Sequence, residues 1–227
     1  MKMKRYTYIL GITILISFNS CGFYQPQMVD IPLISSKKDL RIDIGASIIP
    51  SAYTTVSYGL TNELSIQSYV RISDKNKYYI QGALGLYKKL TDNKVLEWYN
   101  GVGYGYGNAY NDANPGNLTG NYHQIFTQLN YGKTNCQFAN MDIGIGLKAG
   151  YIGAFLLNDN NYYEPFQISN VENHNLLLEP QAFVRLGSKR LKFSTKLGYG
   201  ILFKLFNTDK KLPYEPLNLG IGINYSF

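Results

Sequence analysis

The chain offers few side chains that could act as a catalytic base or a metal ligand. It has two histidines, His123 and His174, among 227 residues. Enzymes that cleave lipids or peptides commonly pair a histidine base with a hydroxyl or a carboxylate, and Asp112, Asp159 or Glu172 could supply the carboxylate. No spacing selects one of these partners, and two histidines alone do not make a zinc site. The sequence therefore predicts no catalytic residue, no metal and no cofactor, and an enzyme acting on lipid or peptide ranks third among the candidate functions.

The first 20 residues have the pattern of a secretory signal peptide. Three positive residues come first: Lys2, Lys4 and Arg5. An eleven-residue apolar core follows at residues 8–18, which is too short to cross a bilayer as a helix. The pair Ser20-Cys21 resembles a bacterial lipoprotein cleavage site, which would make Cys21 the acylated first residue. An ordinary secretory signal with an incidental cysteine is the alternative.

The chain has only one other cysteine, Cys136. If Cys21 is acylated, Cys136 has no partner and the protein has no disulfide; a bridge between the two is the alternative. The formal charge is +7, and it falls to +4 when the three cations of the signal are removed. The remaining basic residues are scattered, so we expect no nucleic-acid partner.

Ten segments of the chain alternate between apolar and polar residues. In residues 138–156, for example, Met141, Ile143 and Ile145 alternate with Asp142 and Gly144. Successive side chains of a strand point to opposite faces, so each segment predicts a strand with one apolar and one polar face. No run of 18 apolar residues occurs, which excludes a helical span. The ten segments are 40–48, 52–60, 64–72, 78–87, 95–107, 121–132, 138–156, 174–186, 191–206 and 216–227.

The polar face of these segments carries too few charges to be the surface of a water-soluble barrel. An apolar exterior around a polar interior is typical of barrels that span membranes, and closure leaves no strand edge unpaired in hydrocarbon. We therefore predict an all-β fold, a closed antiparallel up-and-down transmembrane β-barrel of about ten strands, with eight or twelve as alternatives. The charged residues expected to form a network in its lumen are Arg41, Asp43, Arg71, Glu97, Asp142, Lys148, Glu179, Arg185, Lys192 and Lys196.

Two interpretations of this lumen stay open. Paired charges and bulky inward side chains would fill it, and this is the favoured interpretation because buried charges need partners. A charged lining would instead give a small, weakly selective pore. Glycines recur at alternate positions, such as Gly101, Gly103 and Gly105. They are not expected to bind phosphate, because no helix follows them. We expect them instead to allow strong twist of the strands. The inward aromatic residues are Tyr53, Tyr69, Tyr79, Tyr87, Tyr99 and Phe183.

The connections between segments differ in length. Residues 61–63, 90–94, 133–137 and 187–190 are short turns, whereas residues 108–120, 157–173 and 207–215 are longer. In outer-membrane barrels short turns face the periplasm and longer loops the exterior. Ten strands place both ends of the barrel at the short turns. We therefore predict a signal peptide at 1–20, a lipid-anchored periplasmic linker at 21–38 and an outer-membrane barrel at 39–227.

Several segments of the chain follow the strand-and-turn order of a known group of proteins. They are residues 24–33, 58–65, 97–104 and 128–132. In this order they resemble small outer-membrane barrel proteins of Bacteroidota, over roughly residues 24 to 227. The final Ile223, Tyr225 and Phe227 resemble the C-terminal signal read by the barrel-assembly machinery. The resemblance implies a fold and a location, and it carries no catalytic residues.

The function predicted from these observations is a non-catalytic outer-membrane lipoprotein. It would have a structural role in the envelope or a surface interaction through its long loops, with a small pore as the alternative. The expected partners are outer-membrane lipid, the barrel-assembly and lipoprotein-processing machinery, and an extracellular ligand or glycan. Aromatic residues of the loops are the candidates for that interaction: Tyr110, Tyr162, Tyr163, Phe166 and Tyr214.

Overall fold

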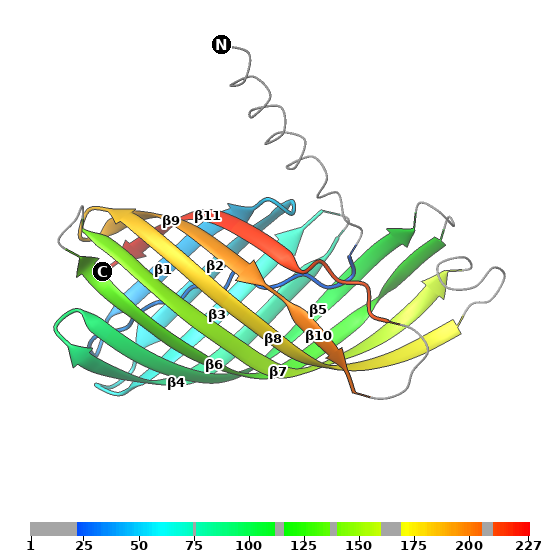
Figure 1. The fold of residues 1–227 in the computed structure, drawn as a ribbon, viewed down its shortest axis with the longest axis horizontal. Coiled ribbons are helices and arrows are strands. Elements are labelled where there is room, and N and C mark those ends of the chain that lie inside the picture. The colour runs from blue at the N-terminus through cyan, green and yellow to red at the C-terminus, as the bar shows by residue number, and fades with distance from the viewer. Residues whose placement is uncertain (1–21, 75, 112–115, 137–139, 160–168, 206–210) are drawn as a thin grey trace, which may run out of the picture.

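The computed structural model describes residues 22–227 except 75, 112–115, 137–139, 160–168 and 206–210. Its strands form one closed antiparallel barrel (Figure 1). The strands are β1 (Leu40–Ser47), β2 (Ser51–Gly59), β3 (Leu64–Ser73), β4 (Tyr78–Thr91), β5 (Lys94–Asn111), β6 (Gly116–Cys136), β7 (Met141–Asp159), β8 (Ser169–Gly187), β9 (Leu191–Tyr199), β10 (Ile201–Lys204) and β11 (Leu217–Ser226). Among the described residues, no helix is long and apolar enough to cross a membrane.

The barrel wall has ten strand positions, as the alternation predicted. Strands β9 and β10 are separated only by Gly200, and both pair with β8, so together they occupy one strand position in the wall. The first and last strands close the barrel, with Asp43 of β1 opposite Asn224 of β11. The barrel is therefore closed around its circumference, although β10 itself pairs only with β8 among the described strands.

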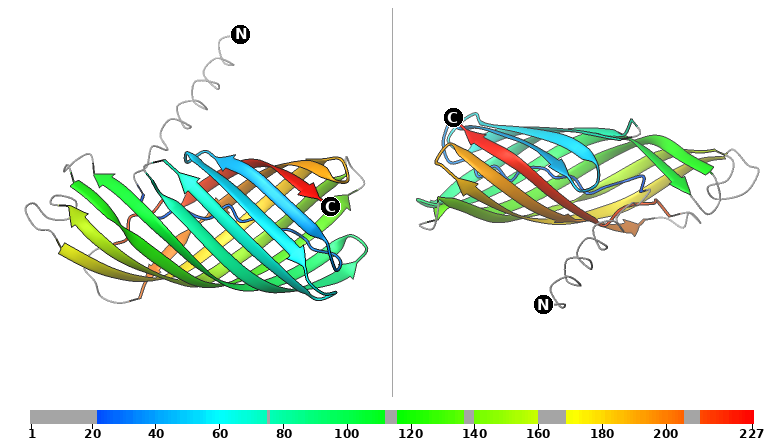
Figure 2. Two further views of the ribbon diagram at one scale, coloured as in Figure 1. Left: turned by 180° about the vertical axis from the view of Figure 1, so that it is seen from behind. Right: turned by 90° about the horizontal axis from the view of Figure 1, so that it is seen from above.

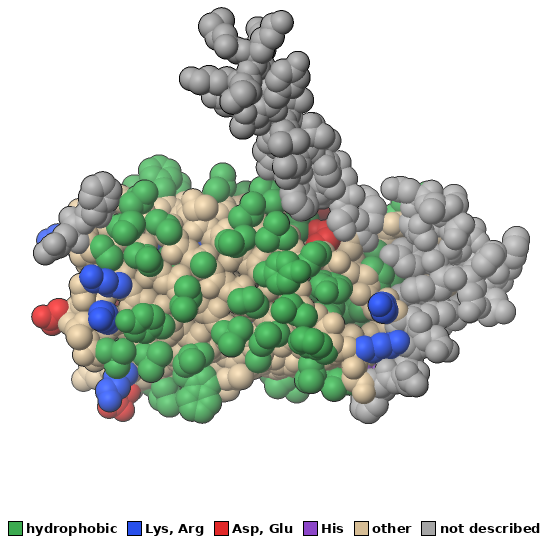
Figure 3. All heavy atoms as spheres, in the orientation of Figure 1, with side chains coloured by type: hydrophobic (Ala, Val, Ile, Leu, Met, Phe, Trp, Pro, Cys, Tyr) green, Lys and Arg blue, Asp and Glu red, His purple; other side chains and the backbone are tan. Residues whose placement is uncertain are grey.

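The two faces of the wall differ as the alternation predicted. In β4, for example, Tyr79 and Gln81 are buried, whereas Ile80 and Leu84 are exposed. Apolar side chains cover the middle of the outer wall, and charged side chains gather at its two ends (Figure 3). The exterior is therefore an apolar belt suited to hydrocarbon, around an interior of polar and aromatic residues.

The hairpins β5–β6 and β7–β8 are longer than the sequence predicted. Asn108 pairs with Thr119, and Leu157 pairs with Asn170, so much of the two expected loops, residues 108–120 and 157–173, is strand. The prediction was wrong there because apolar alternation ends with the apolar belt, whereas backbone pairing continues beyond it. Tyr110 consequently lies in β5, with its side chain exposed.

The segment before β1 runs through the inside of the barrel (Figures 1 and 2). Every residue from 22 to 34 is buried, although we expected this stretch to form a linker outside the barrel. That expectation was wrong because the segment has the composition of an interior: it contains a single charged residue, Asp30, in thirteen. Pro26 and Pro32 favour an extended course and need no partner for a backbone N–H.

The two ends of this segment lie at opposite ends of the barrel. We call the end that carries the connections β5–β6 and β10–β11 the long-loop rim, and the end that carries β2–β3 and β8–β9 the short-turn rim. Gly22 lies at the long-loop rim, where its N–H donates to Glu215 Oε1 at 3.1 Å. Lys38 lies at the short-turn rim, where its N–H donates to the carbonyl of Gly59 at 2.8 Å. The C-terminus is also at the short-turn rim, since the N–H of Phe227 donates to the carbonyl of Leu40.

Candidate functional site: the filled lumen

A row of tyrosines lines the half of the lumen nearer the long-loop rim. The ring centroids of Tyr53 and Tyr69 lie 6.2 Å apart, those of Tyr69 and Tyr79 6.1 Å, and those of Tyr79 and Tyr122 5.7 Å. We call the buried residues 22–34 the lumen segment. The ring of its Tyr24 meets the ring of Tyr122 edge-on, with the centroids 5.5 Å apart. These rings pack the segment against four strands of the wall.

The glycines of β5 leave room for these rings. A Cβ on Gly103 would overlap the hydroxyl of Tyr79, and a Cβ on Gly105 would overlap the ring of Tyr122. Both tyrosines lie on the strands that flank β5, so their side chains cross over a strand that has none at those positions. The glycine pattern thus serves ring packing, a role that the sequence analysis did not foresee.

We expect the variant Gly103→Val to lose about 1–3 kcal/mol of unfolding free energy, because the added side chain displaces Tyr79. The matched control is Gly82→Val, on the neighbouring strand and facing outward, where a Cβ would have no atom within 4 Å. Urea titration of the refolded proteins, followed by gel migration, measures both. Equal stability of the two variants would contradict the proposed role of the glycine.

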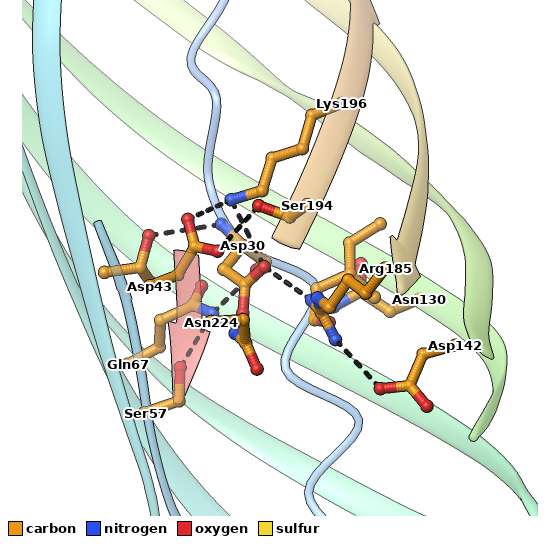
Figure 4. A network of polar contacts seen from close by, with 12 residues as sticks. Asp30, Asp43, Ser57, Gln67, Asn130, Asp142, Arg185, Ser194, Lys196 and Asn224 are labelled. Atoms are coloured by element: carbon orange, nitrogen blue, oxygen red, sulfur yellow. Dashed lines mark hydrogen bonds and ion pairs between the residues drawn. The ribbon is translucent and has the colours of Figure 1, made fainter. Parts of the chain in front are cut away.

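Asp30 is the centre of the buried charge network (Figure 4). Its Oδ1 accepts from Arg185 Nη2 at 2.5 Å and lies 3.2 Å from Lys196 Nζ, while its Oδ2 accepts from Asn224 Nδ2 at 3.1 Å. Lys196 also donates to Asp43. One carboxylate of the segment thereby holds two cations that the wall supplies from β8 and β9.

The network continues toward the short-turn rim through Asp142. Its Oδ1 accepts from Lys192 Nζ at 2.5 Å, and its Oδ2 lies 4.0 Å from Arg185 Nη1. Arg185 therefore connects the carboxylate of the segment to a carboxylate of the wall. All of these side chains are buried, which makes each charge dependent on its partners.

A second buried ion pair lies beside Tyr24. Lys148 Nζ is 3.7 Å from Glu179 Oε2, and it donates to Gln81 Oε1 at 2.9 Å. The hydroxyl of Tyr24 donates to Glu179 Oε1 at 2.6 Å. The lumen segment is thus hydrogen bonded to this pair as well.

Side-chain amides and carboxylates of the wall take the place of a strand partner for the backbone of the segment. Asn218 donates to the carbonyl of Pro26 at 2.9 Å, Gln181 to that of Gln27 at 3.2 Å, and Gln67 to that of Asp30 at 2.9 Å. The N–H of Ile34 donates to Glu97 Oε1 at 2.7 Å. An isolated parallel β-bridge joins Tyr24 of the segment to Tyr214. These bonds give buried backbone groups of the segment side-chain partners, although the segment belongs to no strand of the barrel.

All ten residues expected in the lumen are buried in the structure. Six of them, together with Asp30, form the two networks above: Asp43, Asp142, Lys148, Glu179, Arg185 and Lys196, with Lys192 attached through Asp142. Arg41 pairs instead with Asp39 at the short-turn rim, at 3.3 Å, and Glu97 binds the segment backbone and Asn130. Within the described residues, Arg71 has no carboxylate within 4.0 Å, and its Nε and Nη1 have no hydrogen-bond partner.

The sequence analysis missed Asp30. The signal was an imbalance: the ten predicted residues comprise six cations and four carboxylates, and buried cations are stabilised by carboxylate partners. One carboxylate in an otherwise uncharged apolar and amide-rich segment was the natural candidate to balance them.

The two histidines lie on the outer wall near the long-loop rim, on either side of Tyr151. Tyr151 Oη is 2.5 Å from Nδ1 of His174, and His174 Nε2 is 3.8 Å from Glu172 Oε2. The rings of His123 and Tyr151 are 5.8 Å apart. Asp112 lies outside the described residues, as does the side chain of Asp159. His174 thus lies between the hydroxyl of Tyr151 and the carboxylate of Glu172, one of the three carboxylates that the sequence offered as a partner, whereas His123 contacts the ring of Tyr151.

The remaining predicted residues are distributed over the two rims and the outer wall. Tyr214 is partly buried and packs against the lumen core, so it is no free loop residue. Ile223 and Phe227 are exposed on the outer wall, and the rings of Tyr225 and Phe227 lie 4.7 Å apart. Cys136 is a free thiol at the end of β6 at the short-turn rim. Cys21, Tyr162, Tyr163 and Phe166 lie outside the described residues.

Comparison with known proteins gives matches among solved structures alone. No protein-family model matches the chain, and no curated protein matches it. One similar solved structure is a KdgM porin, with 10% identity and a TM-score of 0.38, covering 83% of this chain and 99% of that chain. Another is a KdgM porin in complex with disordered oligogalacturonate, with 9% identity, a TM-score of 0.37 and the same coverage. Likeness at this level carries no information on a ligand, so the function must be argued from the lumen itself.

Proposed function

We propose that this protein is a small, non-catalytic outer-membrane pore that is closed by its own lumen segment, residues 22–34. The observation that carries the proposal is that the wall closes without the segment, because β1 pairs directly with β11. The segment lies inside as a separate extended chain held by side chains. The wall alone therefore surrounds a bore wide enough for a polypeptide, and its lining is polar.

An opened bore would prefer anions. Departure of Asp30 removes the carboxylate that Arg185 and Lys196 share, and Arg71 already lacks a carboxylate partner among the described residues. Rings of cationic side chains give anion preference in pores. We propose weak anion selectivity, since Asp43, Asp142 and Glu179 stay in the wall.

The test is conductance in a planar bilayer before and after the segment is cut from the wall. A recognition sequence for a site-specific protease is inserted after Lys37, which is exposed at the short-turn rim, and the cut segment is washed out in mild denaturant. We expect no conductance from the uncut barrel and steady, anion-preferring steps after cutting. The variant Arg185→Gln should weaken that preference.

The matched control carries the same recognition sequence after Asn62, in the exposed turn between β2 and β3. Cutting there nicks the wall and leaves the segment attached, so the control should stay silent. A barrel cut after Lys37 that stays folded, loses its segment and still does not conduct would contradict the pore.

A permanently closed barrel with a surface or structural role is the second candidate. The density of buried contacts favours it: Asp30, Tyr24 and Ile34 each bind the wall through charged side chains. Such a barrel would act through its long-loop rim, where Tyr110 is exposed. This candidate predicts that the uncut barrel shows no conducting events, even when the variant Asp30→Asn weakens the hold of the wall on the segment.

A further inference from the structure

The chain enters the barrel from the long-loop rim. The carbonyl of Gly22 accepts from Lys77 Nζ at 3.1 Å, and the N–H groups of Phe23 and Tyr24 lie 3.0 and 3.1 Å from the carbonyl of Pro213. Lys77 and Pro213 belong to the connections β3–β4 and β10–β11, which both lie at that rim. Four contacts with two connections therefore fix where the chain enters, when the Gly22–Glu215 bond is included.

From this entry the chain passes through the lumen in one direction. Its contacts move from Glu179 at Tyr24, through Arg185 at Asp30, to Glu97 at Ile34, and residues 36–38 emerge at the short-turn rim. Gly22, where the described chain begins, is thus on the opposite side of the barrel from the start of β1. Counting strands alone had placed both ends of the mature chain on one side.

We propose that the mature N-terminus is displayed on the side of the long loops, so that an acyl group on Cys21 anchors the protein in the leaflet at that rim. In the orientation expected from the connection lengths, this is the outer leaflet of the outer membrane. The partner of the N-terminus is accordingly the lipid of that leaflet. This replaces the periplasmic anchor that the sequence alone predicted.

The proposal also sets an order of events in assembly. An acylated residue carries hydrocarbon chains that have no place in a lumen lined with charged and amide side chains. The lumen is also filled along its length by residues 22–34. The barrel must therefore close around a segment that is already in place, with acylation preceding closure.

The test uses the full chain in Gram-negative cells, with one epitope inserted in three separate positions. The first position is between Cys21 and Gly22, the second is after Asn62 at the short-turn rim, and the third is between residues 113 and 114, in the connection β5–β6. Antibody binding is compared between intact and permeabilised cells. We expect the N-terminal and 113–114 epitopes to bind antibody without permeabilisation and the Asn62 epitope only after it.

The three results together distinguish the direction in which the chain passes through the barrel from the orientation of the barrel in the membrane. If the N-terminal epitope has the same accessibility to antibody as the Asn62 epitope, the proposal is overturned, whichever side of the membrane the two face. An inverted barrel would exchange the Asn62 and 113–114 results, and the N-terminal epitope should still follow the latter. Metabolic labelling with a clickable fatty acid tests the anchor: label that is lost in Cys21→Ser supports it, and an unlabelled parent protein overturns that part. Neither readout depends on conductance.

Discussion

Replacing Asp30 with asparagine is expected to cost about 3–5 kcal/mol, the usual effect of removing one partner from a buried ion pair. The variant Asp30→Asn keeps the shape of the side chain and removes its charge, which leaves Arg185 and Lys196 buried without their shared carboxylate. Part of this lost free energy had stabilised the binding of the lumen segment to the wall. At 1.4 kcal/mol for each factor of ten, the released fraction of the segment should rise about 100-fold or more.

The effect of Asp30→Asn is measured by urea titration of the refolded barrel and by the frequency of conducting events. Its matched control is Asp92→Asn, which removes the same charge from a solvent-exposed pair with Lys89 at 3.6 Å. Exposed pairs of this kind contribute about 0–1 kcal/mol. If the two variants lose similar stability, the segment is not held by the charges assigned to it.

The barrel itself followed from the sequence because one physical rule acts along the whole wall. A strand between lipid and a polar lumen must alternate, so Ile80 and Leu84 could be assigned outward and Tyr79 and Gln81 inward without any structure. The same rule placed Arg185 and Lys196 inside. It could not say which carboxylate each would meet, since partners across a lumen are fixed by strand tilt and by what else lies inside.

The content of the lumen did not follow, for two physical reasons. The segment 22–34 makes no ladder, so it shows no alternation, and hydrogen bonds from Gln67, Gln181 and Asn218 to its backbone leave no trace in its own sequence. Strand ends beyond the apolar belt were missed for a related reason. Asn108 and Thr119 pair through their backbones while their side chains need no apolar face.

The central claim is that residues 22–34 occupy the lumen, and the labelling rate of a cysteine on that segment tests it most directly. In a background with Cys21→Ser and Cys136→Ser, the variant Met28→Cys places a thiol where the native side chain is 1% exposed. The control Lys37→Cys places one on the same chain beyond the short-turn rim, where the residue is exposed. A small water-soluble maleimide reports both.

We expect the thiol at residue 28 to react at least about 100-fold more slowly than the thiol at residue 37 in the folded barrel. A factor of this size corresponds to an opening free energy of about 2.8 kcal/mol. The two thiols should react at the same rate after heating in detergent. Equal rates in the folded barrel would mean that the lumen is not filled by this segment, and would contradict the account.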